Sequence, residues 1–374
     1  MKIYSYYSVI LFFTLYLSCA QDNPPFIESP NEINYSYETV IDGIDIPWGL
    51  AFISENDFLV TEISGTLYRV VNGTKTSVEG LPEVYVRGQG GLLDVALHPD
   101  YTNNNTIFMT ISANTEGDDE GGNTALYSAI LDGNSLKDVK LLYKATPNTK
   151  KGQHWGSRIV FDREEYLYFG IGDRGNRDVN PQDISRDGGK IYRLNLDGSI
   201  PKDNPFVGKE NAKEAVFSYG HRNPQGMVTH PKTGEIWEHE HGPKGGDEIN
   251  IIKPGINYGW PTITYGINYS GTPITDKTSM PNMAQPYYYW VPSIGPSGMA
   301  FSSSGVYPDW TDNLFAGSLK FEYLERLVIE NNKVVKREKV LDKIGRVRNV
   351  VEGPDGYLYL GVEGKGILKI VHNK

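Results

Sequence analysis

Two glycine-rich stretches carry side chains suited to acid–base and hydrogen-bond chemistry. In residues 87–94, Gln89 offers an amide donor and a carbonyl acceptor on a backbone that neighbouring glycines allow to turn tightly. In residues 152–158, His154 is a candidate general base, because an imidazole with a pKa of about 6.5 exchanges protons at neutral pH. Either stretch alone also suits an ordinary polar turn, so the two gain meaning only together with the clusters that follow.

Two further clusters favour recognition of carbonyl groups and binding of a cation. In residues 219–226, Arg222 presents five donors in a rigid fork and Asn223 an amide, although an arginine stapling a turn to a carboxylate fits the same pattern. Residues 240–250 place carboxylates beside exposed carbonyls in a glycine- and proline-rich loop, which suits Ca²⁺ or, alternatively, a solvated acidic loop. EF-hand spacing is absent, and no HExxH motif favours zinc.

A late group of cations comprises Lys320, Arg346 and Arg348. Side chains alternate between the two faces of a strand, so Arg346 and Arg348 share a face if this segment is extended. The chain has 36 basic and 46 acidic residues and a net charge of −10, which argues against general nucleic-acid binding. Clustered cations in such a chain favour a small anionic ligand, with surface salt bridges as the alternative.

Nucleotide-binding motifs are not supported. Residues 170–175 match GxGxxG, but the polar residues 176–181 that follow end in proline and open no apolar-faced helix, so the dinucleotide interpretation fails. The chain also lacks a P-loop, a GxSxG elbow and a CxxC motif. This argues against a P-loop NTPase, an α/β-hydrolase and an iron–sulfur protein.

Six β-hairpins recur along the chain and must position these clusters. At about 40–50 residues per four-stranded blade, six blades fit the chain length. We predict an all-β, six-bladed β-propeller with four-stranded antiparallel blades, closed by residues 33–40 in the last blade; a pair of β-sandwiches is the alternative. The hairpin strands are expected at 57–63 with 66–71, 105–111 with 125–131, 166–171 with 190–194, 235–239 with 248–252, 313–317 with 323–329, and 356–362 with 366–371.

The N-terminus reads as a targeting segment. The apolar run 9–17 spans about 14 Å as a helix, too short to cross a bilayer. Cys19, the only cysteine, follows a small residue as in bacterial lipoprotein signals. We predict a signal peptide at 1–18, a tether at 19–32 and a catalytic propeller at 33–374. The expected location is the cell envelope, as a periplasmic or outer-membrane-anchored lipoprotein, or else secretion.

In order, the motifs resemble those of the soluble PQQ-dependent glucose/sorbosone dehydrogenase family, which includes the aldose sugar dehydrogenases. The resemblance implies a six-bladed propeller that binds pyrroloquinoline quinone (PQQ) and Ca²⁺, oxidises an aldose at C1 to its lactone and passes electrons to an acceptor. The motifs are Pro47–Phe52, Gly88–Leu93, His154 with Gly156 and Arg158, Gly170–Asp173, His221–Gly226, Glu240–Asn250, Asn257–Pro261 and Arg346–Arg348.

The resemblance also implies roles for individual residues. His154 falls on the catalytic base, and Gly242 and Pro243 would give carbonyls to calcium with Glu248 as a carboxylate. Gln153 departs from the Asp or Asn that often precedes the catalytic histidine, and Ser293 from a frequent Thr. The implied cofactor contacts are Gln89, Arg222, Asn223, Tyr258, Ser293, Lys320, Arg346 and Arg348, with Arg222 also catalytic.

Two other functions compete with this one. A propeller fold does not fix function, so a non-catalytic propeller that binds glycans or a partner protein is the main alternative. A calcium-dependent lactonase would need several carboxylates in the central channel, whereas the best loop offers mainly carbonyls.

Overall fold

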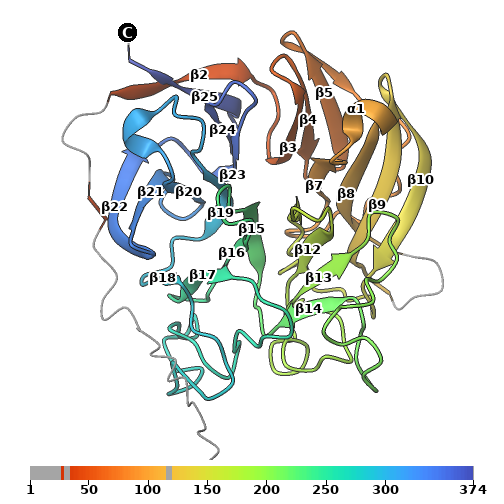
Figure 1. Ribbon diagram of the computed structural model, residues 1–374, viewed down its shortest axis with the longest axis vertical. Helices are drawn as coiled ribbons and strands as arrows, with labels where there is room; N and C mark the ends of the chain where they lie inside the picture. Colours follow the sequence, from red (N-terminus) through yellow and green to blue (C-terminus); the bar gives the residue numbers. More distant parts are fainter. Residues whose placement is uncertain (1–26, 29–33, 115–119, 374) are drawn as a thin grey trace, which may run out of the picture.

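The computed structural model describes residues 27–28, 34–114 and 120–373 (Figure 1). Their strands form six small sheets arranged in a ring, a six-bladed β-propeller as predicted. From the channel outward, blade 1 contains β3 (Pro47–Ser54), β4 (Asp57–Glu62), β5 (Thr66–Val71) and β6 (Thr74–Ser77). Blade 2 contains β7 (Leu92–Leu97), β8 (Thr106–Ala113), β9 (Asn123–Asp132) and β10 (Ser135–Lys144). Blade 3 contains β11 (Ile159–Phe161), β12 (Leu167–Ile171), β13 (Lys190–Leu194) and β14 (Val216–Tyr219).

Blades 4 to 6 repeat the pattern. Blade 4 contains β15 (Pro224–Thr229), β16 (Ile236–Glu240), β17 (Asp247–Ile251) and β18 (Tyr288–Trp290). Blade 5 contains β19 (Pro296–Phe301), β20 (Leu314–Ser318), β21 (Leu324–Glu330) and β22 (Lys333–Leu341). Blade 6 contains β23 (Val347–Glu352), β24 (Leu358–Val362), β25 (Gly366–His372) and β2 (Tyr35–Ile41). The six predicted hairpins are the second and third strands of the blades. Pairing within each four-stranded blade is antiparallel.

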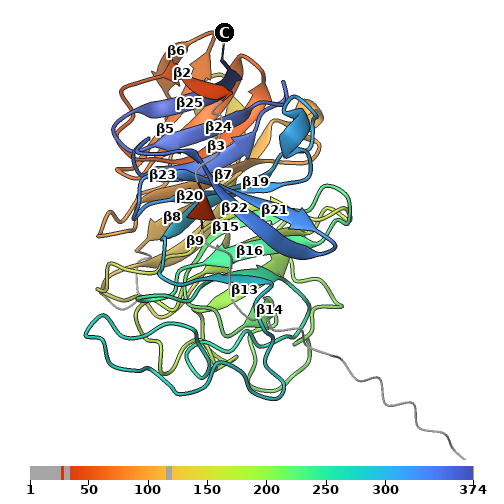
Figure 2. The same cartoon turned by 90° about the vertical axis from the view of Figure 1, so that its left-hand side faces the viewer.

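The ring closes by pairing the two ends of the propeller. β2 lies antiparallel to β25, with Tyr35 opposite His372 and Thr39 opposite Leu368. The predicted closing strand is therefore confirmed, although Ile33 falls outside the described residues. Farther upstream, β1 (Ile27–Glu28) adds a parallel edge to β22 (Figure 2). The predicted signal peptide, Cys19 and the remainder of the tether also lie outside the described residues.

The core lies between neighbouring blades, because both faces of each sheet are covered. Leu59, Leu67, Leu92 and Met109 pack between blades 1 and 2 with no exposed surface. β12 is buried at every position, which explains its nearly continuous apolar sequence. Burying each such side chain stabilises the fold by roughly 1.5–3 kcal/mol.

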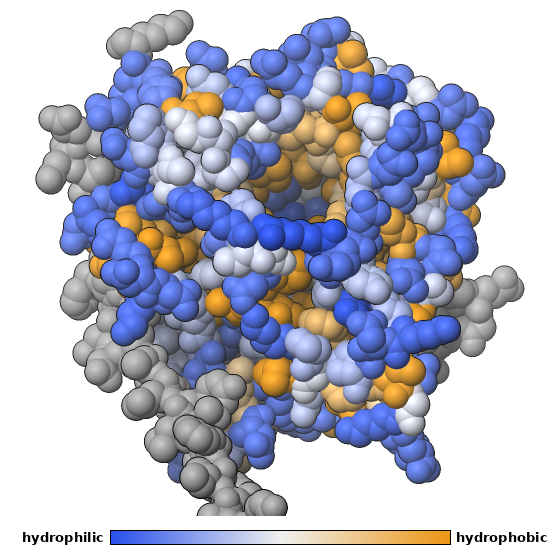
Figure 3. All heavy atoms as spheres, viewed as in Figure 1, coloured by the Kyte–Doolittle hydropathy of each residue, from blue (hydrophilic) through white to orange (hydrophobic). Residues whose placement is uncertain are grey.

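The innermost strands of the six blades surround a central channel. One end of it forms a cavity of about 490 Å³ with mainly apolar walls, to which Val95, Val160 and Val228 contribute. Figure 3 shows the hollow at the centre of the ring with apolar atoms around it. Among the described residues, no helix has the length and apolar character needed to cross a membrane.

Candidate functional site

Two cavities lie side by side where the innermost strands begin, at the other end of the channel. The first, called here the His154 cavity, measures about 400 Å³; its walls include Gln89, His154, Asp173, Arg222, Pro243 and Trp260. The second, the arginine cavity, measures about 390 Å³; its walls include Trp48, Gln89, Gln225, Lys320, Arg346 and Arg348. Gln89 lines both cavities, so the structure brings the predicted base and the predicted cationic group to one place.

His154 is fixed on both its backbone and its ring. Its N–H donates to Gln89 Oε1 over 2.9 Å, and its Nδ1 lies 2.6 Å from Asp173 Oδ1. Asp173 follows the end of β12 and accepts a second bond, 3.0 Å long, from Trp260 Nε1. With Asp173 ionised, Nδ1 carries the proton, which leaves Nε2 as the basic nitrogen of the ring.

The loop that carries His154 adopts a backbone conformation uncommon outside glycine. His154 has a φ of 59°, in the left-handed region. Arg174 braces the loop from behind: its guanidinium lies 3.3 Å from the centre of the Trp155 ring and donates to the carbonyls of Lys151 and Gln153. Such bracing is what keeps a strained residue in place.

The protonation states of this pair follow from burial and neighbouring charges. Burial, helped by the Arg222 charge, lowers the pKa of His154 below its usual 6.5, although Asp173 opposes the shift. Burial acts to raise the pKa of Asp173, but the hydrogen bond and charge of His154, together with Arg222 and Trp260, hold it below its ordinary value. At neutral pH the pair is therefore a neutral imidazole beside a carboxylate, the state that a general base requires.

Arg222 and Asn223 are held by the strand next to them. The Arg222 Nη1 donates to the carbonyls of His241, at 2.8 Å, and Gly242, at 3.2 Å. The Glu240 carboxylate at the end of β16 accepts from the backbone N–H groups of both Arg222 and Asn223. The buried Asn223 Oδ1 accepts from the Gly156 N–H at 3.2 Å, so this side chain supports the His154 loop.

The arginine cavity concentrates positive charge around one carboxylate. Glu363 accepts from Arg346 Nε at 2.8 Å and also pairs with Arg348 Nη2, whereas the exposed Lys320 has no carboxylate partner among the described residues. Burial lowers the pKa of Arg348 to about 10, so it stays charged at neutral pH. The cavity therefore has an excess of positive charge and suits an anion.

Three predicted cofactor contacts, Tyr258, Ser293 and Asn223, lie outside the described walls of both cavities. The Tyr258 hydroxyl donates to the Ile251 carbonyl at 2.6 Å, and its ring stacks on His221 with centroids 4.7 Å apart. The Ser293 hydroxyl donates to Asp247 Oδ1 at 2.8 Å.

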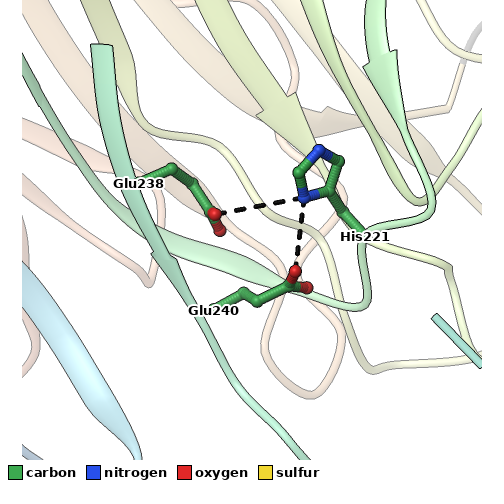
Figure 4. A group of neighbouring side chains, drawn as sticks. All are labelled: His221, Glu238 and Glu240. Carbon is green, nitrogen blue, oxygen red and sulfur yellow. Dashed lines mark hydrogen bonds and ion pairs between the residues drawn. The ribbon is translucent and has the colours of Figure 1, made fainter. Parts of the chain in front are cut away.

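Beside Arg222, blade 4 holds a cluster of buried acidic side chains. His221 Nδ1 lies 3.2 Å from Glu240 Oε1 and 3.9 Å from Glu238 Oε2 (Figure 4). Glu248 lies opposite Glu240 in the β16–β17 pair, and Asn250 lies opposite Glu238, so all four side chains share one face of the sheet. Burial and then the charge of Glu240 raise the pKa of Glu238 and of Glu248 well above the usual range.

This acidic cluster fits a cation. The buried Glu238 Oε1 and Asn250 Oδ1 have no hydrogen-bond partner in the described structure. A small cavity of about 10 Å³, the room that one water-sized sphere needs, lies next to the cluster. Its walls include Glu240, Gly242, Glu248 and Tyr258. Of the predicted calcium ligands, Gly242 and Glu248 thus lie here, whereas Pro243 lines the His154 cavity.

A model of the glucose/sorbosone dehydrogenase family matches residues 44–369. The chain belongs to this family. Aldose sugar dehydrogenase YliI of Escherichia coli (strain K12) is 40% identical over 331 residues, covering 86% of this chain and 88% of the relative. A glucose dehydrogenase crystal structure has a TM-score of 0.86 at 39% identity, covering 91% of this chain and 99% of its own. The PQQ-bound aldose sugar dehydrogenase of Streptomyces coelicolor has a TM-score of 0.71 at 28% identity, covering 93% and 100%.

Relatives named as dehydrogenases are oxidoreductases, and this member of the glucose/sorbosone dehydrogenase family is an enzyme of that class. Its site includes residues to which the motifs assigned no role. Asp173 belonged to a quoted motif, but its pairing with His154 depends on a loop folding back. Glu363 had no signal, because only the sheet brings it beside Arg346 and Arg348. Glu238 had one: it lies two residues before Glu240 of the 240–250 cluster, so the two side chains share a face if this segment is a strand.

Proposed function

We propose that this dehydrogenase oxidises an aldose at C1 to the lactone, with PQQ as the bound electron acceptor and Ca²⁺ as a second cofactor. The observation that carries the proposal is the junction at Gln89, where a neutral histidine paired with a carboxylate meets a cationic cavity. The PQQ-bound relative supports the choice of cofactor. When bound, PQQ supplies a quinone carbon that accepts hydride, and calcium supplies a Lewis acid that polarises the quinone.

The arginine cavity fits the cofactor by charge. PQQ is a flat tricarboxylate, and Lys320, Arg346 and Arg348 provide cationic donors around it. Hydrogen bonds between charged partners contribute roughly 1.5–3 kcal/mol each when shielded from water. Trp48 adds a flat apolar wall whose ring lies 4.9 Å from the Arg348 guanidinium carbon. We propose that these four residues and Gln89 form the cofactor slot.

His154 acts as the general base in this proposal. Its Nε2 removes the proton of the sugar C1 hydroxyl, while Asp173 keeps the proton on Nδ1 and stabilises the imidazolium that forms. Arg222 is anchored by two carbonyls in the same cavity and stabilises negative charge that develops on oxygen. Gln153, the residue before His154, is neutral, but His154 still has a carboxylate partner, because Asp173 pairs with its Nδ1.

Calcium has two candidate sets of donors in the proposal. One set is the backbone carbonyls of Gly242, which accepts from Arg222 Nη1 at 3.2 Å, and of Pro243, a residue that lines the His154 cavity. The carboxylates of Glu238, Glu240 and Glu248 form the acidic cluster next to it, where a hard divalent ion would neutralise the mutual repulsion. We propose that at least the acidic cluster holds calcium.

The decisive experiment is reconstitution of the metal-free protein with PQQ and Ca²⁺. We expect a shift in quinone absorbance on titration and reduction of an artificial dye when aldoses are added. A protein that binds neither PQQ nor calcium and oxidises no sugar in a broad panel would instead support the non-catalytic propeller.

A further inference from the structure

Arg158 crosses the middle of the channel and takes no part in the chemistry proposed above. The residue is only 4% exposed, and its guanidinium is surrounded by acceptors. Nη1 donates to the Trp48 carbonyl at 2.8 Å and approaches Asp94 Oδ1 at 3.3 Å. Nε donates to the Gln225 carbonyl at 2.8 Å, and Nη2 to the Arg348 carbonyl at 2.7 Å.

These contacts link blade 3 to the innermost strands of four other blades. Trp48, Asp94, Gln225 and Arg348 belong to blades 1, 2, 4 and 6, and Arg158 itself directly precedes β11 of blade 3. Blade 5 joins through Ser297, whose hydroxyl donates to the same Arg348 carbonyl at 2.8 Å. One guanidinium therefore sets the relative positions of the strands around the axis.

Arg158 also separates the two ends of the channel. All three residues whose carbonyls accept from it, Trp48, Gln225 and Arg348, line the arginine cavity. Arg158 and Asp94 line the apolar cavity of about 490 Å³ at the opposite end. Two guanidiniums lie near the Trp48 ring, with the Arg158 carbon 5.6 Å and the Arg348 carbon 4.9 Å from its centre.

A buried charge is a costly way to fill a channel. Replacing buried ion pairs by well-packed apolar residues often leaves proteins equally or more stable, so stability alone does not explain an arginine here. What an apolar side chain lacks is a rigid fork of donors that fixes several carbonyls in direction as well as distance. The residues that carry these carbonyls, Trp48, Gln225 and Arg348, also line the arginine cavity.

We propose that Arg158 is a positioning residue, which orients Trp48, Gln225 and Arg348 beneath the redox cofactor and closes the channel below it. The inference rests on the proposed function, since it assumes that the arginine cavity binds PQQ. Arg158→Lys keeps the charge beside Asp94 but replaces the fork by a single ammonium. We expect PQQ, titrated with Ca²⁺ and followed by absorbance, to bind at least tenfold more weakly.

The comparison needs a matched control and a second variant. Arg193, a buried arginine of blade 3 paired with Asp203, lies outside both cavity walls, so Arg193→Lys should lower the melting temperature without changing PQQ affinity. Ser297→Ala removes one donor to the Arg348 carbonyl and should weaken PQQ severalfold at a nearly unchanged melting temperature. Because Ser297→Ala makes so small a change, it serves as the test if Arg158→Lys fails to fold.

Two further readouts separate positioning from general support. At saturating PQQ, the KM for the aldose in Arg158→Lys should stay within about twofold of wild type. In Arg158→Ala, added methylguanidinium should restore PQQ affinity, because the vacated position borders the apolar cavity. Folded variants that bind PQQ as tightly as a binding-competent wild type would overturn this inference alone; a wild type that fails to bind PQQ would overturn the proposed function as well.

Discussion

The His154 cavity and the arginine cavity have nearly equal volumes, about 400 and 390 Å³, but different chemical characters. The first places a neutral imidazole between a carboxylate and Arg222, so protons can move there. The second gathers three cations, of which Arg346 and Arg348 pair with Glu363. The difference indicates that proton transfer and anion binding occur in separate cavities, on opposite sides of Gln89. Substitutions on the two sides should then change different measurements.

The largest effect is expected for His154→Ala. Loss of the base should lower kcat by roughly 10²–10⁴-fold, while the arginine cavity keeps its charge and binds PQQ as before. Steady-state dye reduction and an absorbance titration measure the two quantities. His98→Ala, in a turn of blade 2, serves as control. A parallel loss of PQQ affinity would show that the two cavities do not act separately.

Asp173→Asn should have the next largest effect, a loss of kcat on the order of 10²–10³-fold, because the amide no longer fixes the proton on Nδ1. In wild type the base must be neutral, so kcat/KM should fall as the pH drops through a pKa below 6.5. Removing the carboxylate lowers that pKa further and moves the acid limb to lower pH. Asp183→Asn is the control from the same loop, and an acid limb moved to higher pH would contradict the assignment.

Arg348→Gln tests the other side. The loss of one buried charge-assisted contact, roughly 1.5–3 kcal/mol, should weaken PQQ about 10–100-fold. The acid limb of kcat/KM should stay where it is, because Asp173 and Arg222 still face His154. Arg69→Gln, in the half-exposed pair with Asp57 of blade 1, should leave PQQ affinity unchanged. A shifted pH profile in Arg348→Gln would break the division between the cavities.

The smallest effect concerns the acidic cluster. At a calcium concentration of about ten times its Kd, the ion should stabilise the wild type by about 1.4 kcal/mol. Glu248→Gln should lose this gain, yet in chelator it should be no less stable than wild type, because it removes repulsion with Glu240. Thermal unfolding with and without Ca²⁺ gives both values, and Glu210→Gln is an exposed control. If Ca²⁺ stabilised Glu248→Gln as much as wild type, the ion would have to bind outside the acidic cluster.

The sequence was sufficient for the architecture because each hairpin is local. Strands such as β4 and β5 are joined by a short turn and alternate or repeat apolar residues, so their pairing needs no distant information. The closing pair, β2 with β25, joins residues more than 300 positions apart, but a ring of complete blades leaves few other places for residues 35–41. The shared architecture also explains why the polar clusters meet at one end, because they lie just before innermost strands or at the turns between the second and third strands of a blade.

The contacts between individual site residues were harder to predict, because they depend on how each loop folds back toward the cavities. Nothing in the spacing links Asp173 to His154 or Glu363 to Arg348. Tyr258 and Ser293 show the converse: the resemblance implies that both contact the cofactor, yet their hydroxyls donate to acceptors on blade 4, and neither residue lines the His154 cavity or the arginine cavity. The acidic cluster needed the register of β16 against β17, which the sequence of one strand does not contain.

Because the ring closes on blade 6, the chain can be circularly permuted. The N–H of Asn373 donates to the carbonyl of Asn34 at 2.8 Å, so the two boundaries of the propeller touch on blade 6. A short peptide linking them would leave every blade intact, and new ends could be cut into an exposed turn such as 133–134 on blade 2. In such a circular permutant all four strands of blade 6 would be contiguous in sequence. The ring would then close at blade 2, where β9 and β10, at the two new ends of the chain, would pair.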